Sequence, residues 1–317
     1  MQVKRLVAIA FFFLTLVIFI LLAEPAKTKI IADANFTKTR ASISQKTTQR
    51  IAQNIYFSPE INQFAPVKGC ESQPPANPPE PSLPAALTST PITLERFRKP
   101  LPASTANPTS SQKGITYNPS EVIALAASSN YGERYLKDLS GQPANNPPII
   151  VLHETVGSAN SVINFFQEFH TDEDNQASYH ALIATDGSII YFVPPDKRAF
   201  GAGNSVFVSS LGTESVQTNP RYPSSVNNFA YHISLETPAD GMHDGYNHSG
   251  YTEPQYQSLA WLVAKTDVPL ERITTHRIVD RSGSRIDPRS FNFNLFQNLL
   301  SQYPRTKEIS IGCPSAL

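Results

Sequence analysis

The sequence predicts a mixed α/β domain, preceded by an N-terminal apolar helix and a proline-rich spacer. Short apolar runs rich in β-branched residues alternate with stretches of helical periodicity, which indicates strands and helices within one unit. Two of the runs flank an Asp-Gly turn and predict a hairpin. We divide the chain into a signal peptide or membrane anchor (1–26), a low-complexity linker (27–118), the domain (119–305) and a C-terminal tail (306–317).

The first residues have the pattern of an export or anchoring signal. Residues 1–5 carry two positive charges, and residues 6–23 form an uncharged apolar run of 18 residues. Such a run is long for the core of a signal peptide and adequate for a membrane-spanning helix. Both alternatives stay open, and the membrane is an expected partner only if the segment is uncleaved. In either case the remaining chain is expected outside the cytoplasm, in the periplasm or cell envelope, either secreted or anchored.

Residues 27–118 are predicted to be an extended spacer. Thirteen prolines occur from Pro59 to Pro119, with small and polar residues between them. Proline lacks a backbone donor and fixes φ, so the densest stretch, residues 73–81, cannot form a helix or a central strand. A polyproline-like conformation is therefore expected there.

The elements of the domain are short and mixed in type. Strands are expected at 149–152, 179–184, 189–193, 230–235 and 273–276, and helices at 120–128, 158–169, 252–265 and 291–303. Thr252 and Gln255 form a capping box at the start of one helix. A domain of about 185 residues can bury a sizeable core.

Composition excludes some classes of function. Lys+Arg and Asp+Glu balance at 26 each, so the basic excess typical of a nucleic-acid binder is absent and no such partner is expected. No Cys-x-x-Cys pair occurs, which excludes a thiolate zinc site or a redox dithiol. Cys70 and Cys313 can form a disulfide if the chain is exported, or they are two unrelated thiols.

Three residues are candidate metal ligands. His153 follows a buried strand, His276 ends another, and Asp287 lies eleven residues later. A catalytic zinc needs three protein ligands and one open position, and it accepts two imidazoles and a carboxylate. Spacing alone is a weak signal, because the chain has seven histidines. No His-Glu-x-x-His motif occurs, which argues against an unrelated zinc peptidase.

Four motifs in order strengthen this interpretation. They are Ile-Val-Leu-His ending at His153, Ser-Tyr-His-Ala-Leu-Ile (178–183) with Asp-Gly (186–187), Val-Pro-Pro-Asp-Lys-Arg-Ala-Phe-Gly-Ala-Gly (193–203), and Thr-His (275–276) with Asp-Pro (287–288) and Phe291. Residues 149–301 thereby resemble the zinc-dependent N-acetylmuramoyl-L-alanine amidases of the type 2 amidase family, which includes T7-type lysozyme and the peptidoglycan recognition proteins.

The resemblance implies a central mixed sheet flanked by helices and one Zn²⁺ per chain. It also implies peptidoglycan as the partner, with hydrolysis of the amide between N-acetylmuramic acid and L-alanine during cell-wall remodelling or recycling. The alternative is a non-catalytic peptidoglycan-binding module of the same fold. All three candidate ligands are present, which favours catalysis.

The resemblance also suggests catalytic residues, with departures from the usual pattern. Tyr179 matches a tyrosine used in one branch, with a structural hairpin tyrosine as the alternative. Another branch uses a glutamate where Ser234 falls here. Glu236 lies two residues on and shares that strand face, unless it is a solvated edge carboxylate. Arg285 replaces a usual lysine, so it can stabilise an oxyanion but cannot donate a proton.

Further positions are assigned more simply. Phe200 and Gly201 replace a usual Trp-His pair, so glycan contacts there are expected to differ. Glu154 should point to the strand face opposite His153, in a supporting or surface role. His180 is expected in the core or supporting a ligand. His243 and His248 lie in a loop, residues 239–250, for which a mobile rim is favoured over metal binding. That loop and residues 204–228 are expected to contact substrate.

Overall fold

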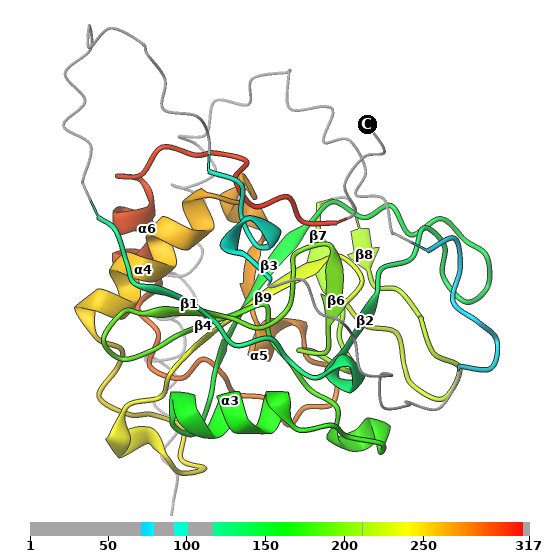
Figure 1. Ribbon diagram of the computed structural model, residues 1–317, viewed down its shortest axis with the longest axis horizontal. Coiled ribbons are helices and arrows are strands. Elements are labelled where there is room, and N and C mark those ends of the chain that lie inside the picture. Colours follow the sequence, from blue (N-terminus) through cyan, green and yellow to red (C-terminus); the bar gives the residue numbers. More distant parts are fainter. Residues whose placement is uncertain (1–70, 79–91, 101–116, 211, 313–317) are drawn as a thin grey trace, which may run out of the picture. The chain divides into compact units, whose positions relative to one another are not determined.

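The computed structural model describes residues 71–78, 92–100, 117–210 and 212–312 (Figure 1). The apolar run 6–23, Cys70 and Cys313 lie outside these residues, as does most of the proline-rich segment. Within the described ranges, no helix has the length and apolar character needed to cross a membrane.

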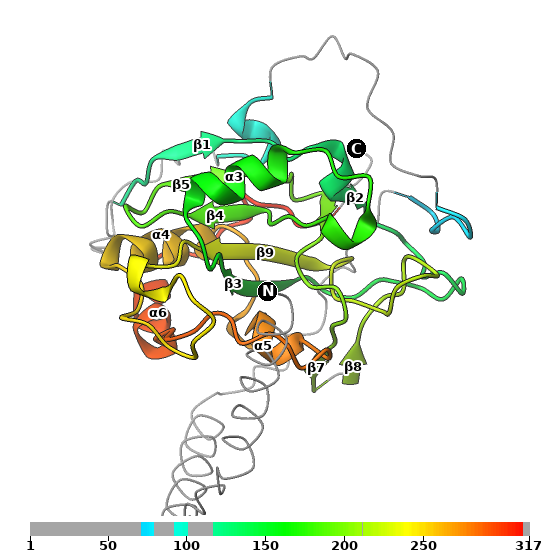
Figure 2. The same cartoon turned by 90° about the horizontal axis from the view of Figure 1, so that it is seen from below.

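A six-stranded mixed sheet forms the centre of the domain (Figure 2). Its order is β1 (Glu121–Ile123), β5 (Ile189–Tyr191), β4 (Ala181–Ile183), β9 (Ala230–Leu235), β3 (Ile149–Glu154) and β10 (Ile273–Thr275). β4 and β5 pair antiparallel, and the other neighbours pair parallel. The central strands β3 and β9 are buried at every position, including the polar side chains that they carry.

Helices cover both faces of this sheet. They are α3 (Ala159–Gln167), α4 (Glu253–Ala264), α5 (His276–Val279) and α6 (Phe293–Leu300). α4 and α6 pack on the face that carries Ile150 and Leu152, whereas Phe166 of α3 packs on the other face against Leu182. Side chains alternate along a strand, so His153 points to the α3 face and Glu154 to the α4 face. The predicted mixed sheet flanked by helices is confirmed.

Short ribbons and turns complete the domain. The ribbons pair β2 (Tyr131–Glu133) with β6 (Lys197–Ala199), and β7 (Phe207–Ser209) with β8 (Gly212–Glu214). The 3-10 turns are Leu94–Arg96, Ser128–Asn130, Glu173–Asn175, Ala239–Gly241 and Leu270–Arg272.

Several local predictions are confirmed in detail. Thr252 and Gln255 form the predicted capping box at the start of α4. The Asp-Gly turn joins β4 to β5, and Gly187 adopts φ +87°, a conformation that favours glycine. The last helix is shorter than the predicted range 291–303: α6 begins at Phe293 and ends at Leu300.

The predicted helix at 120–128 is wrong. Residues Glu121–Ile123 form β1, which pairs parallel with β5. The extended pairing continues beyond it, since the Ala124 amide donates to the Tyr191 carbonyl at 2.9 Å and the Ala126 amide to the Phe192 carbonyl at 3.1 Å. These backbone amides therefore donate to carbonyls of the neighbouring segment and not to carbonyls within a helix. Pairing with the sheet overrides the helix propensity of these residues.

The predicted boundary of the domain at residue 119 is also wrong. Phe97, within the predicted linker, is 1% exposed and belongs to the main core cluster. Arg98 forms ion pairs with Glu121 at 2.6 Å and Glu308 at 3.1 Å. Proline excludes regular secondary structure but not burial, so a short segment between prolines packs onto the domain.

Candidate metal centre

Two neighbouring parallel strands bring the candidate ligands together. Leu152 of β3 is in register with Thr275 of β10. The next residue of each segment is a candidate ligand, so His153 and His276 lie at the same edge of the sheet. Their rings lie 4.6 Å apart between centroids. Asp287 completes the set, with a carboxylate oxygen 3.1 Å from His276 Nδ1 and 3.4 Å from His153 Nδ1. One ligand atom from each residue lies within 4.8 Å of the other two.

The protonation states fit a divalent metal. Burial lowers the pKa of His153 to about 4, so its imidazole is neutral at physiological pH. Burial opposes ionisation of Asp287, but the neighbouring imidazoles of His153 and His276 outweigh it and hold the pKa of that carboxyl below its usual range. His153 Nδ1 is buried and has no hydrogen-bond partner among the described residues. A buried nitrogen aimed at a second imidazole and a carboxylate is a donor set that suits zinc.

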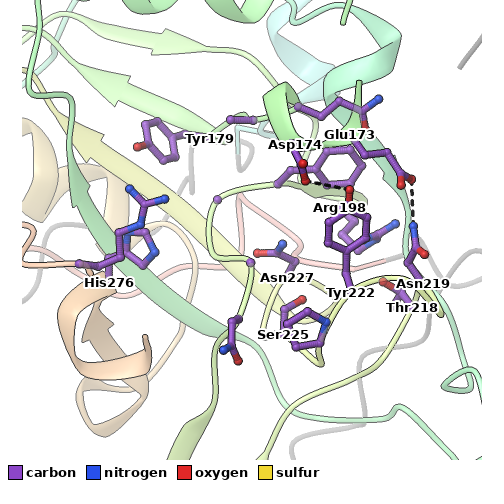
Figure 3. A pocket seen from close by; sticks show the side chains of 18 of the residues that line it. Glu173, Asp174, Tyr179, Arg198, Thr218, Asn219, Tyr222, Ser225, Asn227 and His276 are labelled. Carbon is purple, nitrogen blue, oxygen red and sulfur yellow. Dashed lines mark hydrogen bonds between the residues drawn. The ribbon is translucent and has the colours of Figure 1, made fainter. Parts of the chain in front are cut away.

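His276 and Asp287 line a cavity of about 800 Å³, whereas His153 has no exposed surface. Figure 3 shows His276 and Tyr179 on one side of this cavity and Asp174, Asn219 and Tyr222 on the other. Seven residues of the predicted rim segment 204–228 line it: Asn204, Thr218, Asn219, Tyr222, Pro223, Ser225 and Asn227. The lining therefore extends from the candidate ligands to residues of the segment 204–228.

Tyr179 lies against the first ligand. Its ring stacks on His153 with 4.7 Å between centroids, and it packs edge-on against Phe166 of α3. Burial raises the pKa of Tyr179 above its usual range, and the charge of Asp287 adds to this effect. The side chain is therefore a protonated phenol, which can donate a hydrogen bond into the cavity.

Arg285 is exposed and lines the same cavity. It lies two residues before Asp287, in the same lining as His276 and Asp287. The structure therefore brings Tyr179 and Arg285 to the three candidate ligands.

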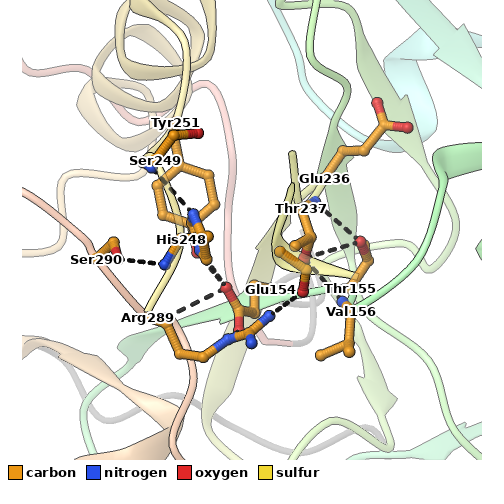
Figure 4. A network of polar contacts seen from close by, with 12 residues as sticks. Glu154, Thr155, Val156, Glu236, Thr237, His248, Ser249, Tyr251, Arg289 and Ser290 are labelled. Atoms are coloured by element: carbon orange, nitrogen blue, oxygen red, sulfur yellow. Dashed lines mark hydrogen bonds and ion pairs between the residues drawn. The ribbon is translucent and has the colours of Figure 1, made fainter. Parts of the chain in front are cut away.

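The structure does not bring Glu236 to the site, and this corrects the expectation. Its two carboxylate oxygens accept hydrogen bonds from the backbone amides of Ala159 and Thr185, each at 2.8 Å. β9 ends at Leu235, so the chain has left the strand before Glu236 and its side chain reaches the start of α3. Figure 4 shows Glu236 apart from the network around Glu154. Ser234, in register with His153, occupies the strand position beside the ligand.

Glu154 lies opposite His153, as predicted, but it is buried rather than on the surface. It forms an ion pair with Arg289 and accepts hydrogen bonds from His248 at 3.0 Å and Tyr251 at 2.6 Å (Figure 4). The prediction of a rim loop at 239–250 is therefore only partly right, because the His248 side chain is fully buried.

One residue in contact with a ligand was missed by the sequence analysis. His232 Nδ1 lies 2.9 Å from His153 Nε2, and both residues are completely buried. His180, predicted as a core or supporting residue, accepts a hydrogen bond from the His232 amide at 3.0 Å and does not contact a ligand. Alternation along β9 places His232 and Ser234 on one face of the sheet. The sequence does not show how β9 is aligned with β3, and this alignment is what brings that face to His153.

Two imidazoles and a carboxylate at the edge of a mixed α/β sheet, beside a pocket, could hold one metal ion. Residues 143–290 match the family model described as N-acetylmuramoyl-L-alanine amidase. This match supports the resemblance to the type 2 amidase family that the motif order predicted.

Several solved structures are similar to part of this chain. A selenomethionine derivative of AmpD has 23% identity, with 59% of this chain and 97% of that chain covered and a TM-score of 0.40. The amidase LysC from Clostridium intestinale URNW has 20% identity, coverage of 58% and 99%, and a TM-score of 0.35. The Drosophila peptidoglycan recognition protein SD has 15% identity, coverage of 61% and 99%, and a TM-score of 0.36. No curated protein matches the sequence.

Proposed function

We propose that this domain hydrolyses the amide bond between N-acetylmuramic acid and L-alanine in peptidoglycan, with one Zn²⁺ held by His153, His276 and Asp287. The observation that carries the proposal is the buried, unpartnered Nδ1 of His153 facing His276 and Asp287, within the segment that matches the amidase family. When bound, zinc supplies Lewis-acid polarisation of the amide carbonyl and acidifies the attacking water.

The protein side chains have separate tasks in this proposal. The Tyr179 hydroxyl donates a hydrogen bond to the developing oxyanion, because burial keeps it protonated. Arg285 contributes a fixed positive charge at the same place and cannot act as a proton donor. The cavity beyond them, bordered by Asp174 and Tyr222, holds the remainder of the muropeptide.

Zinc analysis and muropeptide release together test the proposal. The purified chain should contain one zinc per molecule and release stem peptides with a free L-alanine amino terminus from isolated sacculi, as read by mass spectrometry. A chelator should abolish the release and added zinc should restore it. His153→Ala should lose both zinc and release. A zinc-loaded chain that leaves muramoyl–alanine bonds intact would contradict the proposal.

A second candidate is a binding module that does not cut. Two observations favour it: Ser234 stands where one branch of the family has its glutamate, and Glu236 is engaged with backbone amides. This function predicts sedimentation with sacculi that persists in His153→Ala, without any hydrolysis by the native chain.

We also propose that the domain acts outside the cytoplasm, where peptidoglycan lies. The basic start and the apolar run 6–23 support this location. Fractionation of cells that produce the tagged full chain tests it, and a chain found only in the cytosolic fraction would refute it.

A further inference from the structure

The first ligand, His153, has a histidine as its partner on the side away from the metal site. His232 is on β9, next to β3, where Val151 is its register partner and Ser234 is that of His153. The His232 ring reaches across to His153 Nε2 at 2.9 Å. Neither side chain has any exposed surface, so water cannot replace this contact.

The direction of this hydrogen bond follows from the metal site. His153 Nδ1 faces Asp287 and must be unprotonated to bind a metal, so its proton resides on Nε2. That Nε2–H donates to His232 Nδ1, which acts as acceptor. His232 then carries its own proton on Nε2, a buried atom with no partner among the described residues. A buried donor without a partner lowers the stability of the folded state, so the His232 ring is destabilising at this atom.

A neighbouring histidine shows the contrast. His180 is equally buried, and its Nδ1 accepts from the His232 amide at 3.0 Å while its Nε2 donates to the Lys197 carbonyl at 3.1 Å. Its Nε2 also lies 3.2 Å from Arg134 Nη2, so both of its nitrogens have partners outside the ligand set. Of these two buried imidazoles, only His232 touches a candidate ligand.

Gly201 makes room for the His232 ring. A Cβ at position 201 would lie 2.6 Å from both Cγ and Nδ1 of His232, a distance that no packed side chain tolerates. A residue larger than glycine at this position would therefore collide with the His232 ring.

We propose that His232 is the positioning residue that fixes the tautomer and orientation of His153 for zinc, with Gly201 holding the space that its ring needs. Ligating histidines generally depend on such a partner for their other nitrogen. The inference rests on the zinc role of the three ligands proposed above, but not on the identity of the bond that is cleaved.

Zinc affinity, measured by chelator competition on the full chain, tests the proposal. His232→Leu should weaken zinc binding by roughly 10–100-fold, because the acceptor is lost. His232→Asn places an amide oxygen near the position of Nδ1 and should restore binding to within about threefold. His180→Asn is the matched control, with the same substitution at an equally buried position, and should leave zinc affinity unchanged. Loss of zinc affinity in His180→Asn equal to that in His232→Leu would overturn the proposal, because general damage to the sheet would explain both.

A double-mutant cycle tests the role of Gly201 separately. Gly201→Ala should weaken zinc binding in the native background and add nothing in His232→Ala, where the colliding ring is absent. Equal effects in both backgrounds would overturn the coupling. Native zinc affinity in His232→Leu, with the native chain itself binding zinc, would overturn this inference alone. A native chain that binds no zinc would overturn the metal assignment and this inference with it.

Discussion

Glu154 and Arg289 form a buried ion pair on the sheet face opposite the candidate metal site. Glu154 directly follows the ligand His153, and Arg289 lies two residues after the ligand Asp287. Arg289 also donates to the carbonyls of Gly241, His243 and Gly245, at 2.6–2.7 Å. The pair therefore ties the ligand strand, the ligand loop and the loop 239–250 into one unit.

Breaking this pair should destabilise the domain strongly. Arg289→Met leaves a buried carboxylate with no compensating charge, so we expect the free energy of unfolding to fall by about 3–5 kcal/mol in urea titrations. Zinc affinity should fall as well, because the segment that carries Asp287 loses its anchor. Lys307→Met is the control, because Lys307 pairs with Asp267 at 3.5 Å on the surface and should contribute less than about 1 kcal/mol. Similar losses in the two variants would contradict this view of the buried pair.

Glu236 should contribute to stability rather than to catalysis. Glu236→Gln removes the charge at the start of α3 and one of two acceptors, so we expect a loss of about 1–2 kcal/mol in unfolding free energy. Turnover and zinc content of the folded variant should remain native. Glu253→Gln, on the exposed first turn of α4, is the matched control and should change stability by about 0.5 kcal/mol at most. A 100-fold fall in kcat at native stability would return Glu236 to the catalytic residues.

The comparison of Glu236 with His232 shows what the sequence could and could not predict. The buried strands, the capping box and the proximity of His153 to His276 follow from local patterns, because parallel strand ends meet at one edge. Period-two alternation predicted that Glu236 shares the strand face of Ser234. However, β9 ends one residue earlier, at Leu235, and the Glu236 side chain binds the start of α3 and not the metal site. The contact of His232 with His153 depends on the register between two strands, and the burial of Phe97 depends on tertiary packing. Neither can be read from spacing along the chain.

Acidification should destabilise the metal-free protein. Burial lowers the pKa of His153 to about 4 and holds those of His180 and His232 well below 6.5. The unfolded chain binds protons at these residues near pH 6.5 and the folded chain does not, so stability falls as pH decreases from 6.5 towards 4. Each histidine adds up to about 1.4 kcal/mol per pH unit.

Urea titrations in chelator at pH 7.0 and 5.0 measure this effect. His180→Asn removes one of the three titrating groups, so the loss between the two pH values should be smaller in that variant. Equal stability of the native metal-free chain at both pH values would show that these histidines are protonated in the folded state.

Arg285 should affect turnover without holding the metal. Arg285 lines the cavity, and its charge acts on His153, but it is not among the three ligands. Arg285→Ala should therefore lower kcat by about 100-fold, the effect of removing one group that stabilises an oxyanion, while zinc content stays near native. Arg285→Lys keeps the charge and should recover much of the activity. Arg281→Ala is the control, because Arg281 belongs to the same loop, donates to the carbonyls of residues 278–280 and does not line the cavity. Loss of zinc in Arg285→Ala that matches its loss of turnover would instead assign Arg285 to the support of the metal site.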